Sequence, residues 1–507
     1  MSYSPNLCSA FNNTKLRDEK HVTDISGMCS MCSSDCIGSC EIGISALRGA
    51  DAVYPTTTGE NQIASEKTYP IDYSHFNING RAFGAFGAKE DFNQTTINDV
   101  ILEKTIGKRN PIKIKLPIIL PALAKLNWQD YFSGAAMAGV ISFIGEGAAE
   151  KDPDFTLENG KLIYCPKLND FLDAFRKYYR GYGQIVLQVN VDDDRMGVPD
   201  YAIEKCGCEA IEFKFGQSAK GIQPVNKLTS LESALKEYEK GNIVIPDPSD
   251  KKVQKRYKEG KGDTFRLYSR LCMWKEDYLL ERIEELRKKG LKNVYFKMAG
   301  YDPEDIEKVL RIAAKADVDM ITFDGAGGGS GYSPCRMMNE WGLPACIIQC
   351  YINEIGKRLE EERITLPDIA VTGGFTMEDQ VYKALALGAP YTSAVGICRG
   401  SMAAAMSGNN IGKLLKEKKI PKVLRKFGET KEELFPELRE LRNIYGEKAD
   451  SFSEGAIGVY SYLKRIGFGL KHFAALNRKF NIKYINKRDI IPMTYAAKEL
   501  LEGHWRK

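Results

Sequence analysis

Several features that mark whole classes of protein are scarce in this sequence of 507 residues. Acidic and basic side chains nearly balance, because 72 Lys and Arg oppose 67 Asp and Glu, and the two signs are interspersed. A protein that binds nucleic acid through charge carries a concentrated basic face. The formal net charge of +5 shows no such excess. We therefore expect no nucleic-acid partner.

Long hydrophobic runs are also missing. The longest, at 116–123 and 135–144, are far shorter than the roughly 20 apolar residues that cross a bilayer. The first twenty residues are too polar for a secretory signal. These absences predict a cytoplasmic protein with no membrane segment.

Two catalytic motifs are absent as well. The glycine-rich stretch 325–330 ends in serine where a dinucleotide-binding fingerprint needs its last glycine, so a Rossmann site is not supported. A hydroxy-acid oxidase of the barrel type needs a histidine base at the end of a strand. The four histidines lie elsewhere, at His21, His75, His472 and His504.

Cysteine, by contrast, is plentiful and clustered. Without an export signal, thirteen cysteines do not indicate a disulfide framework. Four of them fall within twelve residues, a density typical of an iron–sulfur site, and four thiolates favour a [4Fe–4S] cluster. Zinc is the structural alternative, and unligated thiols are a third. The expected ligands are Cys29, Cys32, Cys36 and Cys40, and Cys8, Cys206 and Cys208 are possible additions.

A repeating pattern follows an irregular N-terminal region. Short apolar and β-branched runs alternate with longer amphipathic stretches, as parallel β/α units require. The predicted strands are 114–120, 139–144, 184–189, 210–215, 294–298, 320–323, 369–372 and 391–395. Helices are expected between them, for example at 168–179, 278–289, 303–316 and 377–387. Eight such units in about 300 residues favour a closed α/β barrel, the (β/α)8 TIM barrel, over an open sheet.

Three parts are therefore predicted along the chain. They are a cysteine-rich iron–sulfur segment (1–95), the barrel (96–405) and a helical C-terminal extension (406–507) with helices at 429–445 and 456–480. The extension is a candidate contact for a homo-oligomer. Between the fourth and fifth strands lies a long excursion, whose basic run at 251–261 is predicted to be a solvated loop rather than a binding patch.

Glycine is concentrated where the predicted strands end, which is where the active sites of such barrels lie. Glycine lets backbone N–H groups approach an anion, and the helix after strand seven would offer its positive end. Tight turns are the alternative, but four strand ends together favour a phosphate-bearing cofactor. The glycines are Gly145 and Gly147 after strand two, Gly325, Gly327 and Gly328 after strand six, Gly373 and Gly374 after strand seven, and Gly396 at strand eight.

Basic residues converge on the same strand ends. Lys214 and Lys297 end strands four and five, and Lys220 and Arg399 follow strand ends. A lysine that faces the pocket can stabilise an anionic reduced flavin or hold a substrate carboxylate. The alternative is a lysine on a solvent-facing rim.

In this order, the motifs resemble the FMN-binding domain of the glutamate synthase large subunit and its stand-alone relatives. The resemblance covers about 110–450, and its most specific parts are 212–220 and the glycine loop 324–334. It implies FMN at the barrel mouth, with a 2-oxo-acid substrate beside it. The expected catalytic residues are Lys214, Gln217 and Lys297. The expected cofactor-binding residues are Gly145, Glu146, Gly147, Lys220, Asp324, Gly325, Gly327, Gly328, Gly373, Gly374, Gly396 and Arg399.

The sequence also departs from that family. The family's three-cysteine cluster motif after strand eight is missing, and only Cys398 stands there. The glutaminase domain needs a cysteine freed at the chain start, and Cys8 is not so placed. We therefore expect no glutamine hydrolysis, and we expect the N-terminal cluster to replace the family's own.

The leading hypothesis is an FMN- and iron–sulfur-dependent oxidoreductase. It would reduce an imine formed from a 2-oxo acid and ammonia or an amine, with ferredoxin or a separate reductase subunit as electron donor. A transfer of an amino or methylamino group is a variant of this chemistry. Two other classes remain: a flavin-free dehydrogenase with Cys335 as nucleophile, and a non-catalytic electron-transfer subunit.

Overall fold

The computed structural model describes residues 71–89, 91–124, 127–216, 225–262, 264–268, 273–326 and 341–504, together with the single positions 46, 270 and 328. Several predicted residues lie outside these ranges. They are the four clustered cysteines (Cys29, Cys32, Cys36 and Cys40), Cys8, Gln217, Lys220, Gly327 and Cys335.

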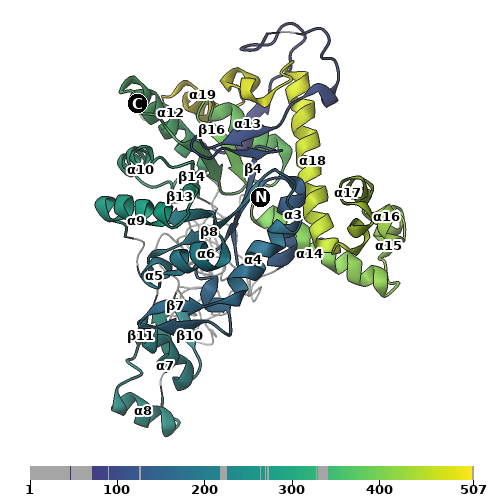
Figure 1. Cartoon of the computed structure of the whole chain (residues 1–507). Helices are drawn as coiled ribbons and strands as arrows, with labels where there is room; N and C mark the ends of the chain where they lie inside the picture. Colours follow the sequence, from purple (N-terminus) through teal and green to yellow (C-terminus); the bar gives the residue numbers. More distant parts are fainter. Residues whose placement is uncertain are drawn as a thin grey trace, which may run out of the picture.

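A closed barrel of eight parallel strands forms the centre of the molecule, as predicted (Figure 1). The strands are β4 (Ile118–Leu123), β5 (Ile141–Ile144), β8 (Gln184–Val189), β9 (Ala210–Lys214), β13 (Asn293–Ala299), β14 (Met320–Asp324), β15 (Asp368–Thr372) and β16 (Thr392–Gly396). Pairing of β16 with β4 closes the ring. The strands are buried because helices cover their outer face, which explains their nearly continuous apolar runs.

The first strand begins later than predicted. Residues Ile112–Ile114 form β3, which pairs antiparallel with β2 (Lys104–Ile106), and the barrel strand starts only at Ile118. Ile106 and Ile114 join the apolar cluster inside the barrel and close its N-terminal end. Ile112 and Ile114 have the same apolar character as the barrel strand, so the sequence did not separate the two. Pro117, which lacks an N–H for a strand ladder, marks the division.

Helices surround the barrel. They are α3 (Trp128–Ala138), α4 (Pro166–Arg176), α5 (Val191–Arg195), α6 (Val198–Cys206), α9 (Glu276–Lys288), α10 (Pro303–Lys315), α12 (Ala345–Glu361), α13 (Glu378–Leu387) and α14 (Arg399–Lys416). The local sequence explains α10, since the Asp302 side chain accepts from the Glu304 N–H and Pro303 takes the first turn. Its Ile306, Val309 and Leu310 face the core. The four helices predicted between strands are confirmed.

The C-terminal extension packs on the outside of the barrel. Its long helix α18 (Glu454–Leu476) lies against α3 and α14, and the smaller helices are α15 (Lys422–Arg425), α16 (Lys431–Leu434), α17 (Leu438–Tyr445) and α19 (Tyr495–Glu502). The single helix predicted at 429–445 is wrong, because Pro436 separates α16 from α17. Strand β17 (Ile490–Pro492) pairs with β1 (Phe76–Ile78). In the described part of the chain, no helix combines the length and apolar character needed to span a bilayer.

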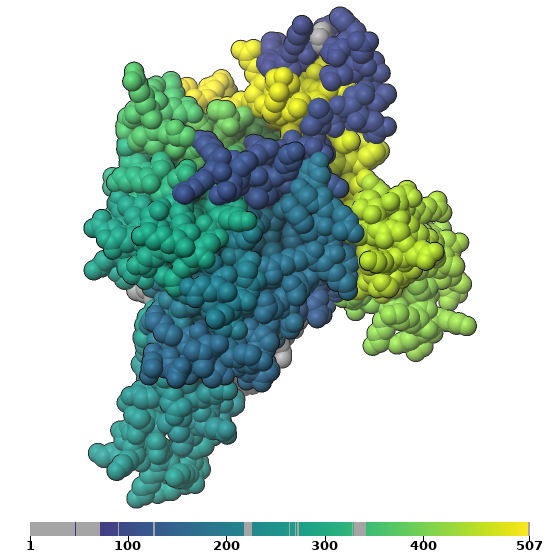
Figure 2. Space-filling view, in the orientation of Figure 1, coloured from purple at the N-terminus to yellow at the C-terminus, as the bar shows by residue number. Residues whose placement is uncertain are grey.

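The excursion between β9 and β13 forms an arm that projects from the barrel at the lower end of Figures 1 and 2. It contains an antiparallel sheet of β10 (Val225–Leu228), β12 (Phe265–Tyr268) and β11 (Ile243–Ile245), with α7 (Leu231–Glu239) and α8 (Lys251–Lys258). Most of the basic run is α8 rather than the predicted loop, because Asp250 caps the Lys252 N–H. The helix buries no residue, so its charges are solvated as expected. A short hairpin, β6 (Thr156–Glu158) and β7 (Lys161–Tyr164), precedes α4.

Candidate functional site at the barrel mouth

The interior of the barrel changes from apolar to polar toward the ends of its strands. Ala210, Tyr295 and Met320 belong to the apolar cluster at its lower level. Because side chains alternate along a strand, Glu212 and Lys214 lie on the same side of β9 as Ala210. Ile211 and Phe213 pack outward against the helices. The strand register therefore places charged side chains in the mouth.

Lys214 lies inside this mouth and not on a solvent-facing rim. Its side chain is 5% exposed, and its Nζ contacts Glu146 Oε1 at 2.5 Å. Glu146 follows β5, so the ion pair connects the loop after β5 to the end of β9. The Trp274 indole N–H donates to the Lys214 carbonyl at 2.8 Å and fixes the end of β9.

Lys297 lies opposite Lys214 on the neighbouring strand β13. It is buried, and among the described residues its ammonium group has no ion-pair or hydrogen-bond partner. Burial alone would lower its pKa, but the carboxylates of Asp324 and Glu212 raise the pKa above its usual value. Lys297 is therefore a protonated cation in the mouth.

Glu212 is a buried acid with an unusual proton affinity. Burial raises the pKa of Glu212 to about 7, although Lys297 and a hydrogen bond from Gln188 act in the opposite direction. The Gln188 amide N–H donates to the Glu212 carboxylate. Near neutral pH, Glu212 can therefore both give and take a proton.

Two further polar atoms in this region have no partner within the described structure. They are the side-chain oxygens of Gln188 and Thr322, both buried. A buried polar atom without a partner is costly, which makes such atoms candidate contacts for a ligand. The sequence alone did not indicate Gln188, Glu212 or Thr322 as site residues. The feature that could have identified them is a polar residue within an otherwise apolar strand.

The glycines of the mouth divide into two groups by their backbone N–H. Those of Gly145, Gly147, Gly325 and Gly328 donate to the protein itself: to the Leu123 carbonyl, the Asp193 carboxylate, and the Thr372 and Gly325 carbonyls. Those of Gly373 and Gly374 donate to no described residue. Gly374 has a φ of +91°, and a Cβ there would meet no atom within 4 Å. Backbone donors are thus available after strand seven.

The helices that follow strands seven and eight differ at their N-termini. At α13, after strand seven, Gln380 Oε1 already accepts from the Thr376 and Met377 N–H groups, and Glu378 and Asp379 occupy the first turn. Its positive end is therefore compensated, contrary to the expectation above. Helix α14 has no side-chain cap and no acid in its first turn, which begins with Arg399. An anion between Gly374 and the start of α14 would meet N–H groups that no described residue uses, and the cation of Arg399.

Asp324, Gly396 and the two cysteines of α6 and its end are the remaining predicted residues that the structure describes. Asp324 is buried at the end of β14 and raises the pKa of Lys297. A Cβ on Gly396 would lie 2.8 Å from the Thr372 Cβ, so this glycine allows two strands to approach. Burial raises the pKa of Cys206 to about 11 and also raises that of Cys208, which makes both neutral thiols.

Part of the barrel matches a known family. Residues 272–407 match the sequence model described as "Conserved region in glutamate synthase". A stretch of 130 residues is 32% identical to the glutamate synthase large subunit-like protein YerD of Bacillus subtilis (strain 168). This match covers 24% of the present chain and 23% of that protein, so it spans about a quarter of each. The glutamate synthase resemblance is therefore confirmed within the barrel.

The chain also aligns with solved structures at TM-scores below 0.5. A flavocytochrome b2 double mutant with pyruvate bound aligns with a TM-score of 0.46 and 15% identity, covering 84% of this chain and 77% of that one. A mandelate oxidase mutant with the monooxide FMN adduct aligns with a TM-score of 0.41 and 16% identity, covering 83% of this chain and 88% of that one.

Proposed function

We propose that this chain, whose residues 272–407 carry the conserved glutamate synthase region, is an FMN-dependent oxidoreductase of the glutamate synthase type. The observation that carries the proposal is the buried pair Lys214 and Lys297, which stands beside the titratable Glu212 in the mouth of the barrel. Two cations in such a mouth suit an anionic cofactor and a substrate carboxylate.

The residues present fit FMN. Its single terminal phosphate would be held by the N–H groups of Gly373 and Gly374, which donate to no described residue, and by Arg399 at the start of α14. The side-chain oxygens of Gln188 and Thr322, which have no partner among the described residues, suit the polar edge of a flavin ring. The described part of the chain contains no dinucleotide fold that would hold an additional adenosine.

The proposed reaction is reduction of an imine formed from a 2-oxo acid and ammonia or an amine. Bound FMN would supply hydride transfer to that imine. Lys214 and Lys297 would bind the substrate carboxylates, and Glu146 would hold Lys214 in position. Glu212, with a pKa of about 7, would deliver a proton to the substrate nitrogen and regain one from solvent.

We further propose that Cys29, Cys32, Cys36 and Cys40 hold a [4Fe–4S] cluster that receives electrons from ferredoxin or a separate reductase subunit. The spacing of these cysteines in the sequence supports this, and zinc is the rival occupant. A reducing compartment such as the cytoplasm suits such a cluster. The six cysteines within the described ranges are all free thiols, which is consistent with that compartment.

Two experiments separate this proposal from its alternatives. Anaerobically purified protein should show flavin absorption, and mass spectrometry of the heat-released cofactor should identify FMN. Recovery of FAD, or of no flavin, would contradict the proposal, and the second result would favour catalysis by Cys335. Turnover of a reduced artificial donor with 2-oxo acids plus ammonia should follow, whereas a non-catalytic electron-transfer subunit would give none.

A further inference from the structure

A cavity of about 580 Å³ lies at the opposite end of the barrel from the mouth. Its walls come from three separate parts of the chain: Glu103 and Lys104 at the start of β2, the region from Leu385 to the first residues of β16, and the C-terminal segment 481–488. It is therefore a site distinct from the lysine pair described above.

Four cationic side chains line this cavity. Lys104, Lys483, Lys487 and Arg488 line it, and none of their side chains forms an ion pair or hydrogen bond with a described residue. Glu103 is the one acidic residue in the lining, and it accepts a hydrogen bond from the Tyr182 hydroxyl at 3.2 Å. Four cations facing one cavity favour a ligand with more than one negative charge.

Lys104 lies in the wall of this cavity and is partly buried. Burial lowers the pKa of Lys104, and the negative charge of Asp368 acts in the opposite direction. The carboxylate of Asp368 is already engaged, because it accepts from the Gly107 N–H at 2.9 Å and from the Ser393 hydroxyl. No described residue forms an ion pair with Lys104. An anion in the cavity would supply that direct partner.

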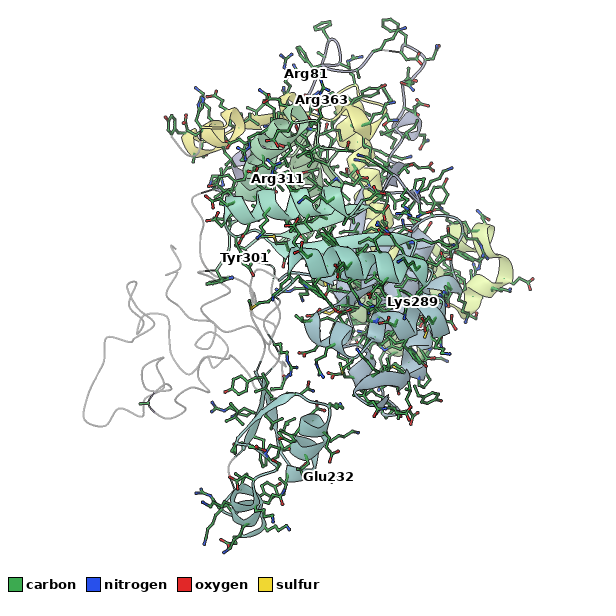
Figure 3. The ribbon with its side chains drawn as sticks, turned by 60° about the vertical axis from the view of Figure 1, so that its left-hand side comes forward. Arg81, Glu232, Lys289, Tyr301, Arg311 and Arg363 are labelled. Carbon is green, nitrogen blue, oxygen red and sulfur yellow. The ribbon has the colours of Figure 1, made fainter. Side chains whose placement is uncertain are left out.

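The rest of the lining is apolar and aromatic. Leu385, Pro390 and Ile482 contribute aliphatic surface, and Phe86 and Tyr484 contribute rings. The guanidinium groups of Arg81 and Arg488 lie 4.0 and 5.0 Å from the centre of the Phe86 ring and hold it in place. Figure 3 labels Arg81 at this end of the molecule and Glu232, in the arm, at the other. A ligand here would need an apolar body as well as negative charge.

We propose that this cavity binds a nucleoside phosphate, with its phosphates toward the four cations and its base against the apolar wall. The volume falls within the roughly 300–1,000 Å³ typical of small-molecule sites. Helix α13 and strand β16 run from this cavity to the loops that carry Gly374 and Arg399. The site is thus placed to act as an effector site, and its occupancy does not depend on the proposed reaction.

Calorimetric titration of the flavin-loaded protein with AMP and ATP tests the proposal. Adenosine and inorganic pyrophosphate serve as probes of the base alone and of the charge alone. We expect a nucleotide to bind more tightly than either probe, and binding to weaken with added salt. Pyrophosphate binding as tightly as ATP would reveal only a nonspecific basic surface and would overturn the proposal, as would no nucleotide binding.

Variants locate the site. Lys104→Met and Lys487→Met should each weaken nucleotide binding about tenfold or more, because each removes a charge-assisted contact. Lys255→Met, on the exposed helix α8, is the matched control and should leave binding unchanged. Bound nucleotide should also protect Lys104 and Lys487, but not Lys255, from acetylation measured by mass spectrometry. This second readout does not require any variant to fold, and equal acetylation of all three lysines would overturn the proposal.

Discussion

Lys214 and Lys297 are register partners on the neighbouring parallel strands β9 and β13, yet among the described residues only Lys214 has a carboxylate in direct contact. Two buried cations on adjacent strands repel each other, so their arrangement requires nearby negative charge. Glu146 supplies it directly to Lys214, whereas Asp324 and Glu212 act on Lys297 through space. The two lysines should therefore respond differently to the same substitution.

Replacing either lysine by Met should impair the use of a carboxylate substrate. A lost charge-assisted contact costs about 1.5–3 kcal/mol, or roughly one to two decades in KM or in kcat/KM. Steady-state kinetics of Lys214→Met and Lys297→Met measure this, with Lys255→Met as the control. Wild-type kinetics in both variants would mean that the pair does not contact substrate.

Stability should separate the two substitutions. Lys214→Met breaks the ion pair with Glu146 in the barrel mouth, so it should lower the free energy of unfolding. Lys297→Met removes a buried cation that has no direct partner among the described residues, so it should cost less. Urea denaturation of both variants at pH 7 tests the order. A larger loss in Lys297→Met would contradict it.

Glu212 should give the protein a measurable pH dependence of stability. Its pKa is about 7 in the folded state and near 4.5 in the unfolded chain, so the folded state holds the extra proton between these values. The free energy of unfolding should therefore fall as pH rises from about 4.5 to 7 and level off above. The upper bound for this loss is about 3 kcal/mol, at 1.36 kcal/mol per pKa unit.

Glu212→Gln removes that titration while it keeps an oxygen that accepts from Gln188. The free energy of unfolding of the variant, relative to wild type, should increase between pH 5 and pH 8. Asp193 and Asp319 also have raised pKa values, so the difference between the proteins is the quantity to measure. Glu232→Gln, at an exposed position on α7, is the control. A difference that does not change with pH would refute the assignment.

Gly374→Ala should weaken FMN binding. Its positive φ of +91° disfavours a side chain, and a methyl group would occupy the open space beside its free N–H. Gly181→Ala is a matched control, because Gly181 has a φ of +81° and equally open surroundings but lies before β8, far from the strand end. Fluorescence titration of the apoproteins with FMN should show a loss only in Gly374→Ala. Equal affinities would remove Gly374 from the phosphate site.

The barrel strands were predictable because buried parallel strands have a simple pattern. An apolar run that ends in a lysine, as at Lys214 and Lys297, also indicates where the polar mouth begins. Gln188 and Glu212 were missed because a polar residue within a strand usually faces solvent. Only closure of the barrel makes the inner side of β8 and β9 a binding surface.

The glycines show what a sequence cannot provide. Gly147 and Gly374 both follow a strand, and both have positive φ. Their difference depends on distant partners: the Asp193 carboxylate uses the N–H of Gly147, and no described residue uses that of Gly374. Such partners come from other loops, so local sequence does not distinguish a structural turn from a phosphate cradle.

The clustered cysteines provide the last prediction, which concerns electron delivery. In the resembling family, the cluster motif follows strand eight, whereas here only Cys398 stands at that position. If Cys29, Cys32, Cys36 and Cys40 replace that motif, anaerobic protein should contain about four irons and four sulfides per chain, with an EPR signal after dithionite.

Cys32→Ala/Cys36→Ala should lose the iron but keep FMN. Cys206→Ala is the control, because that thiol is buried on α6, outside the cysteine cluster. Zinc in place of iron, or iron retained in the double variant, would exclude these cysteines from electron transfer. Loss of ferredoxin-dependent turnover, with flavin reduction by dithionite intact, would place the cluster between donor and flavin.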